Sequence, residues 1–246
     1  YDITPLDTSI TGATFDTFAS QNNVTVNKVG HGLEVGRYVT FTSVSPPAGY
    51  VATDFTTGSF EILTVPDADT FTIQMRVNAG SAASASGSAS INPYVIVGPT
   101  IQTTGYGWGT YLWSDSTWGT ERATSNVTLD PGNWSLDNFG EVLVATIFNG
   151  KTFTWDAGAT NPRTVRASTT TSGFSTSANP TASRFTLVSD RDRHLFHFGT
   201  ETNIGSPSSQ DPMFVRFSNQ EDLNTYLPKA TNTAGTFRLD TGNKIT

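Results

Sequence analysis

The feature that most constrains the fold of this chain is a series of short runs in which apolar and polar residues alternate. An alternation with a period of two places the apolar side chains on one face of a strand. No window of 11 or more residues holds the 3.6-residue apolar period of an amphipathic helix. Thr, Ser, Asn and Gly make up about 42% of the chain, and these types favour strands and turns. The sequence therefore predicts an all-β protein, with strands at residues 24–29, 38–44, 60–65 and 70–75.

A stretch of small residues at 79–90 divides the chain into two parts of different composition. It contains only Ala, Gly and Ser, which bury little apolar area, so it is predicted to be a loop, a linker or a weak edge strand. All five Trp residues follow it. We therefore predict a small β-domain over residues 15–92 and an aromatic-rich β-domain over residues 93–246. Residues 1–14 are expected to form a strand that joins the second domain, which makes the first domain an insertion.

The second domain has the pattern of repeated hairpins. The apolar run 142–148, the pair Asn149-Gly150 and the run 151–155 predict a hairpin with a type I′ turn, in which both central residues have positive φ. Residues 184–198 predict a second hairpin, and further strands are expected at 213–217 and 237–239. One short helical turn is expected over residues 218–223. This arrangement is typical of a partial β-propeller or a β-sandwich.

Charge and composition exclude several classes of protein. The chain has 14 Lys and Arg against 21 Asp and Glu, a net charge of −7, which does not suit a nucleic-acid-binding surface. It contains no Cys, which rules out disulfides, thiolate zinc sites and a cysteine nucleophile. No apolar run approaches the roughly 20 residues of a membrane helix, so stable membrane insertion is not expected.

The three histidines are the first candidates for chemistry. His31 lies between two glycines and is either a ligand or proton carrier, or a residue that caps a loop. His194 and His197 are three apart, and on a strand this spacing puts them on opposite faces. Zinc needs three or four converging ligands, so we expect structural roles for all three histidines and no metal site.

The acidic pairs are the next candidates. Asp67 with Asp69 and Asp190 with Asp192 have the Asp-x-Asp spacing of calcium loops, but both lie in expected turns, where Asp bonds to its own backbone. Asp137 and Glu141 lie in the aromatic-rich part, and two carboxylates flanking a sugar would make a glycosidase. We expect no catalytic residues, no cofactor and no enzyme activity, and a glycosidase is the least favoured alternative.

Glycine-rich and tryptophan-rich patterns precede residue 134. The run Gly105-Tyr-Gly107-Trp-Gly109 lacks the spacing of a dinucleotide-binding loop, and the chain has no Gly-x-Ser-x-Gly nucleophile motif. Trp108, Trp113 and Trp118 recur every five residues. They form either an exposed row for sugar binding or subunit contact, or core anchors of short strands; an odd spacing alternates faces and favours the core.

Two stretches of the second domain resemble virion proteins of tailed bacteriophages. The first is Trp134-Ser-Leu-Asp137-Asn138-Phe139-Gly140-Glu141 with Leu143-Val-Ala145 and Phe153-Thr-Trp155. The second is Asp211-Pro-Met-Phe-Val-Arg216-Phe217-Ser-Asn-Gln-Glu221-Asp222, followed by Pro228, Asn232-Thr-Ala-Gly235 and Arg238-Leu239. Residues 105–246 resemble the tail tubular or nozzle proteins of short-tailed phages, which are based on β-propellers. Phe217 and Tyr226 stand where the family form has Trp.

The first domain carries an independent resemblance. Residues 30–39, 58–62 and 65–72 are similar to small β-modules inserted in many phage tail and connector proteins, which have Asp where this chain has Arg37. Together the resemblances imply a structural virion protein, located in the phage tail. The expected function is a nozzle, tail tube or head-to-tail connector: a homo-oligomeric ring that contacts other tail proteins and through which DNA passes without specific binding. The alternative is a receptor- or glycan-binding tail protein, with contact to the host envelope.

Overall fold

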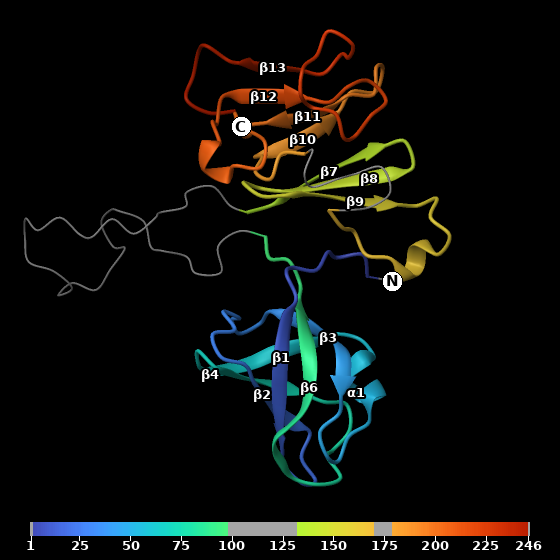
Figure 1. Cartoon of the computed structure of the whole chain (residues 1–246), viewed down its shortest axis with the longest axis vertical. Coiled ribbons are helices and arrows are strands. Elements are labelled where there is room, and N and C mark those ends of the chain that lie inside the picture. The colour runs from blue at the N-terminus through green and yellow to red at the C-terminus, as the bar shows by residue number, and fades with distance from the viewer. Residues whose placement is uncertain (1, 98–131, 170–178, 246) are drawn as a thin grey trace, which may run out of the picture. The chain divides into compact units, whose positions relative to one another are not determined.

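The computed structural model describes residues 2–97, 132–169 and 179–245. The chain separates into two compact units, of residues 2–96 and of residues from 97 onward. The regular structure of the described residues is almost entirely antiparallel β-strand, so the chain is all-β, as predicted (Figure 1). No helix among these residues has both the length and the apolar character to cross a membrane.

The first unit is a closed barrel of six strands. The strands are β1 (Ile10–Thr17), β2 (Asn23–Asn27), β3 (Tyr38–Ser45), β4 (Phe60–Asp67), β5 (Thr70–Gln74) and β6 (Ala83–Pro93). They follow one another around the barrel in the order β1-β2-β5-β4-β3-β6, and neighbouring strands are antiparallel. β2 to β5 coincide with the four alternating runs of the sequence. Closure pairs β6 with β1 and leaves no free edge.

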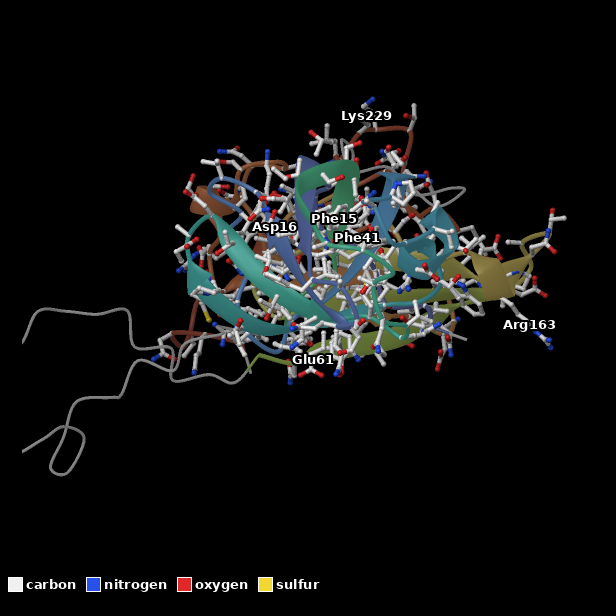
Figure 2. The ribbon with its side chains drawn as sticks, turned by 90° about the horizontal axis from the view of Figure 1, so that it is seen from below. Phe15, Asp16, Phe41, Glu61, Arg163 and Lys229 are labelled. Carbon is white, nitrogen blue, oxygen red and sulfur yellow. The ribbon has the colours of Figure 1, made fainter. Side chains whose placement is uncertain are left out.

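The barrel interior is filled by the apolar residues of these alternating strands. Phe15 on β1 and Phe41 on β3 point inward, as Figure 2 shows, with ring centres 5.7 Å apart. A single helical turn, α1 (Ala52–Thr56), adds Phe55 to this core, with its ring centre 4.6 Å from that of Phe15. All three rings are essentially inaccessible to solvent. α1 was not predicted, because its five residues are too few to show a helical period in the sequence.

The small-residue stretch 79–90 proved to belong to the barrel wall rather than to a boundary. Most of it lies in β6, which pairs with β1 on one side and β3 on the other. Positive φ at Ala85 and Gly87 and shifts in register mark β-bulges in this strand. The stretch is not an edge strand either, because both of its edges are paired.

The prediction that residues 1–14 join the second domain is wrong for the part of that segment the structure describes. Residues 2–14 belong to the barrel unit. β1 begins at Ile10, and before it Asp7 N donates to Pro93 O while Val95 N donates to Pro5 O. These bonds extend the pairing of β1 with β6. The barrel therefore precedes the second unit rather than being inserted in it, and the units divide after Ile96 instead of at residue 92.

The described residues of the second unit form two antiparallel sheets, each built from strands consecutive in sequence (Figure 1). One comprises β7 (Trp134–Phe139), β8 (Val142–Ile147) and β9 (Thr152–Asp156). The other comprises β10 (Phe185–Val188), β11 (Leu195–Phe198), β12 (Phe214–Phe217) and β13 (Gly235–Arg238). Two 3₁₀ turns, η1 (Pro162–Thr164) and η2 (Pro207–Ser209), lie in the connections. Such up-and-down sheets fit both a sandwich and part of a propeller.

The two sheets pack through their inner faces. Val144 of β8, Val188 of β10 and Leu195 of β11 form one apolar cluster, which also contains Tyr226 from the loop after β12. Polar bonds align the layers: Ser135 Oγ donates to Thr186 O at 2.8 Å and accepts from Thr186 N at 3.2 Å. Each sheet therefore has one covered face, and the alternation of side chains directs its remaining residues outward.

The β8–β9 hairpin forms as predicted, but its turn differs. Asn149 has a φ of +54°, whereas Gly150 is not among the residues with positive φ, so the turn is not type I′. Gly150 N donates to Ile147 O and Ile147 N donates to Lys151 O, which makes a three-residue loop. The helical turn expected at 218–223 is absent; these residues form an irregular loop, in which Ser218 Oγ accepts from Leu195 N.

Candidate interaction surfaces

The outer face of the β10–β13 sheet carries a continuous group of phenylalanine rings, which we call the aromatic face. Phe198 stacks on Phe185 with ring centres 4.7 Å apart, and Phe196 stacks on Phe217 at 5.2 Å. Phe196 and Phe198 are 6.0 Å apart, which joins the two pairs. The face consists of Phe185, Leu187, Phe196, Phe198, Val215, Phe217 and Phe237, which alternation places on the side opposite Val188 and Leu195.

This face remains accessible although it is apolar. Leu187 is 49% exposed and Phe237 is 44% exposed, while the four stacked rings are half-buried against one another. Gly235 lies directly opposite Phe217 on the neighbouring strand. A Cβ at position 235 would lie 2.2 Å from the Phe217 ring, so glycine is what lets this ring lie flat across β13. A stacked, half-exposed aromatic surface of this kind is a candidate interaction site.

The outer face of the β7–β9 sheet is also apolar, and we call it the tryptophan face. Trp134, Leu136, Leu143 and Trp155 share it, as the strand register requires. Leu136 is 62% exposed. The Trp134 ring packs edge-on against Phe153, with ring centres 6.0 Å apart. Ala145, Ile147 and Phe153 lie on the same face but are buried, so the accessible part of the tryptophan face is centred on Leu136. The described part of the second unit therefore has accessible apolar side chains on the outer side of each sheet.

At one end of the tryptophan face lies an open hollow of about 360 Å³. Leu143 and Trp155, cross-strand neighbours, supply its apolar lining, while Asn138 and Glu141 supply polar groups. Trp155 is held in place because its Nε1 donates to Pro162 O and to Val165 O, at 3.3 and 3.1 Å. The carboxylate of Glu141 lies beside Gly158, where a side chain would collide with it. An indole beside a carboxylate and an amide is an arrangement that suits a sugar.

Beneath the aromatic face, the inner side of the same sheet holds a buried polar network. His197 Nδ1 lies 2.9 Å from Ser183 Oγ, and its Nε2 lies 3.2 Å from the Tyr226 hydroxyl. Ser183 Oγ is also 3.0 Å from Thr200 Oγ1. Ser183, His197 and Thr200 are all fully buried. The Ser183–His197 pair resembles part of a hydrolase site, but its burial keeps it from any substrate, so it acts in the fold.

Charged groups next to this network are held by backbone atoms. Arg216 donates to the carbonyls of Tyr226, Glu201 and Thr202 at 2.9–3.3 Å. The Glu201 carboxylate accepts from Thr181 N at 3.1 Å, from the Thr181 hydroxyl, and from Gly205 N at 2.7 Å. These bonds satisfy most of the buried polar atoms of the two side chains, although Arg216 Nε is buried without a partner.

Burial determines the protonation of the network. Desolvation, followed by the charge of Arg216, lowers the pKa of His197 to about 3, so the imidazole is neutral at pH 7. Desolvation raises the pKa of Tyr226 well above its usual range, and Asp222 adds to that effect. Desolvation also lowers the pKa of Arg216, which the charge of Glu201 opposes. The network therefore contains neutral His197 and Tyr226 beside the cation of Arg216, which backbone carbonyls hold.

The network could have been found from the sequence through strand register. The turn at 190–192 predicts a hairpin in which Phe185 lies opposite Phe198, and extending that register places Ser183 opposite Thr200. No residue pattern, however, indicates that loop residue Tyr226 reaches His197.

The structure gives each histidine a structural environment. His31 is buried; its Nδ1 accepts from Leu33 N at 2.9 Å, and its ring packs edge-on against Phe71, so it caps a loop as expected. His194 is half-buried and its Nδ1 lies 2.7 Å from Ser218 O. It packs against Phe217 on the aromatic face, whereas His197 points to the opposite side of the sheet. The expected separation of His194 and His197 is confirmed.

The Asp pairs occupy turns, and the first is bonded as turn chemistry predicts. Asp67 accepts from Asp69 N and from the Thr70 hydroxyl, and these bonds lower the pKa of Asp67. Asp69 accepts from Gly30 N at 2.8 Å, which ties this turn to the loop containing His31. Asp190 and Asp192 are exposed in the β10–β11 turn. Among residues 2–97, 132–169 and 179–245, no three His, Asp or Glu side chains are grouped for a metal ion.

The structure does not bring Asp137 and Glu141 together as a catalytic pair. Asp137 accepts from Val188 N at 2.6 Å and lies between the two sheets, whereas Glu141 is at the hollow on the outer side. Trp108, Trp113 and Trp118, and the run Gly105–Gly109, lie outside the described residues. The hollow itself was not predicted; the cross-strand alignment of Asn138, Leu143 and Trp155 follows from hairpin register and was the available signal.

Comparisons with known proteins give little beyond this geometry. Neither a protein-family model nor a curated protein matches the chain. Among solved structures it is similar to one described as "Phage phi92 endosialidase", with 17% identity and a TM-score of 0.29. That match covers 98% of this chain and 33% of the other, so the chain spans about a third of that protein's length. A similarity this low transfers neither fold nor activity.

Proposed function

We propose that this chain is a structural component of a bacteriophage tail, and that copies of it form a ring or tube segment through which DNA passes. The observation that carries the proposal is the pair of outward apolar faces on the second unit. An isolated soluble protein rarely leaves two such faces uncovered, whereas a subunit of a closed assembly needs one for each neighbour.

The phage-like stretches of the sequence coincide with these two sheets. Residues 134–155 form the whole β7–β9 sheet, and residues 211–239 form β12, β13 and the loop between them. Phe217, where the family form has Trp, lies in the aromatic face, and Tyr226, the other such position, is buried between the sheets. Both substitutions therefore keep a large ring where packing uses one, which supports a common architecture.

The charge of the chain suits a DNA conduit. A net charge of −7 repels phosphates, so a lumen lined by this protein would let DNA pass without holding it. The proposal assigns no catalytic step to the chain and no cofactor.

The location can be tested by immunogold labelling. Antibodies raised against the purified chain should label the tail of virions of the phage that encodes it. Label on the capsid shell alone, or no label on intact and osmotically opened virions, would contradict the proposal. Antibody binding to the denatured chain on a blot provides the positive control.

A second candidate function is glycan binding at the hollow beside Trp155. The observation that favours it is the group of Trp155, Glu141 and Asn138 around one open site. Neutral oligosaccharides should bind there, because an anionic sugar would meet the Glu141 carboxylate. A glycan array tests this function: binding that Trp155→Ala abolishes supports it, and an array without signal for the unmodified chain excludes it.

A further inference from the structure

We propose that the aromatic face of one copy docks on the tryptophan face of a second copy, in a head-to-tail contact that repeats around the assembly. This inference rests on the proposed function and specifies the interface that would build the ring. The occupant of each face is therefore another copy of this chain.

The size of the two faces matches what such a contact needs. A standard interface buries about 800 Å² on each partner, of which about 450 Å² is apolar. Leu187 and Phe237 of the aromatic face are 49% and 44% exposed, and the four stacked rings are half-buried. With roughly 150–250 Å² for each large side chain, this face offers on the order of 400 Å² of apolar surface. The tryptophan face offers less, because Leu136 is 62% exposed and Trp134, Leu143 and Trp155 are half-buried, while Ala145, Ile147 and Phe153 of the same face are buried.

The arrangement of the faces favours a head-to-tail contact over a symmetric one. A two-fold contact between two aromatic faces would leave both tryptophan faces uncovered. A contact between unlike faces uses one of each on every copy, and rotation at each step closes it into a ring with no apolar face left open. Within one copy, the inner faces of the same two sheets already show that these layers pack on one another.

The chemistry of the two faces is also compatible. Both consist of aromatic and aliphatic side chains, and offset or edge-on ring contacts of the kind seen between Phe196 and Phe217, or between Trp134 and Phe153, can form across the contact. The strands of the aromatic face direct no charged side chain outward. Glu141 lies at the hollow at one end of the tryptophan face, so the contact has to leave it at the rim, because burying a carboxylate without a partner is costly.

Two matched variants test the interface, each with one lysine at an exposed residue of one face. Leu136→Lys blocks the tryptophan face and Leu187→Lys blocks the aromatic face. Both residues are exposed, so the fold should tolerate lysine, and an unchanged circular dichroism melt verifies that. Val29→Lys, at a residue of the barrel unit that is 79% exposed, is the control for adding one positive charge.

The expected masses, measured by light scattering, are distinctive. The unmodified chain and Val29→Lys should be oligomers. Each face variant alone should be a monomer, because every contact between its copies uses one blocked face. An equimolar mixture of the two variants should form a dimer and stop there, because one intact face of each kind remains.

Other outcomes overturn the inference in separable ways. If both face variants remain oligomers like the unmodified chain, the interface is elsewhere, although a ring can still be the function. If Leu136→Lys alone forms dimers while Leu187→Lys is a monomer, the contact is symmetric between aromatic faces. A monomeric unmodified chain at 50 μM would overturn this interface and also the assembly on which the proposed function depends.

Discussion

His197 should make the second unit sensitive to acid. The imidazole is fully buried between Ser183 and Tyr226, and desolvation, with the charge of Arg216, lowers its pKa to about 3. In the unfolded chain the pKa of a histidine is about 6.5. At pH values between these two pKa values, the unfolded state therefore binds a proton at His197 and the folded state does not.

The sign and size of the effect follow from proton linkage. The free energy of unfolding is unaffected by this group well above pH 6.5 and falls by about 1.4 kcal/mol for each pH unit below it. The loss is about 2.5 kcal/mol between pH 7 and pH 4.5, and it levels off near pH 3 at on the order of 5 kcal/mol. Asp211, whose pKa is lowered by the bond from Met213 N and by Arg238, acts only below its ordinary value near 3.8, so the two windows differ.

Urea unfolding followed by tryptophan emission measures this loss in the second unit. All five Trp residues lie at position 108 or later, so residues 2–96 contribute no indole signal. His197→Gln keeps hydrogen-bonding groups near Ser183 and Tyr226 but cannot bind the proton. This variant should be less stable at pH 7, and its unfolding free energy should change little between pH 7 and pH 4.5.

The control is His194→Gln, at the half-buried histidine on the opposite side of the same sheet. Between pH 7 and pH 4.5, the unfolding free energy of this variant should fall as much as that of the unmodified chain. An unmodified chain whose unfolding free energy is constant from pH 7 to pH 4.5, or a His197→Gln variant that loses stability just as steeply, would refute the assignment of the acid sensitivity to His197.

Three further predictions concern the barrel; hydrogen–deuterium exchange of residues 2–96 measures the first two, and proteolysis measures the third. Phe55→Ala removes a ring from the centre of the core and should destabilise the barrel by about 4 kcal/mol; exchange within 1 kcal/mol of the unmodified chain would contradict the role of α1. Gly87→Ala places a Cβ 2.5 Å from Ser45 O at a φ of +72° and should cost about 3 kcal/mol, whereas Gly36→Ala, with open space at +83°, should cost about 1 kcal/mol. Elastase, despite its preference for alanine, should spare residues 83–90 in the native chain, because β6 is paired on both sides; rapid cleavage there would mean that the stretch is a linker after all.

The strands that could be predicted from the sequence are those in which apolar and polar side chains alternate. The runs at 24–29, 38–44, 60–65 and 70–75 became β2 to β5 because each buries every second residue in the barrel core. The hairpin at 142–155 was equally clear, and its apolar strand is covered on its inner face by β10. All-β architecture was therefore predictable from local pattern alone.

The failures occurred where structure depends on partners far away in the sequence. β6 was missed because strand pairing uses backbone groups, and a run of Ala, Ser and Gly shows no side-chain pattern although β1 and β3 hold it on both sides. The assignment of residues 1–14 failed for a related reason: their partner is the segment 93–95. The two interaction faces follow from strand register once the hairpins are known, but which face stays uncovered is decided by tertiary packing.

The mass and outline of the purified chain test the central claim most directly. Native mass spectrometry together with negative-stain imaging should show one species at a whole-number multiple of 26.3 kDa, with three or more copies in a ring around a central opening. A single species at 26.3 kDa across the concentrations used for imaging would contradict the account, because both apolar faces of the second unit would then be stable in water without a neighbour.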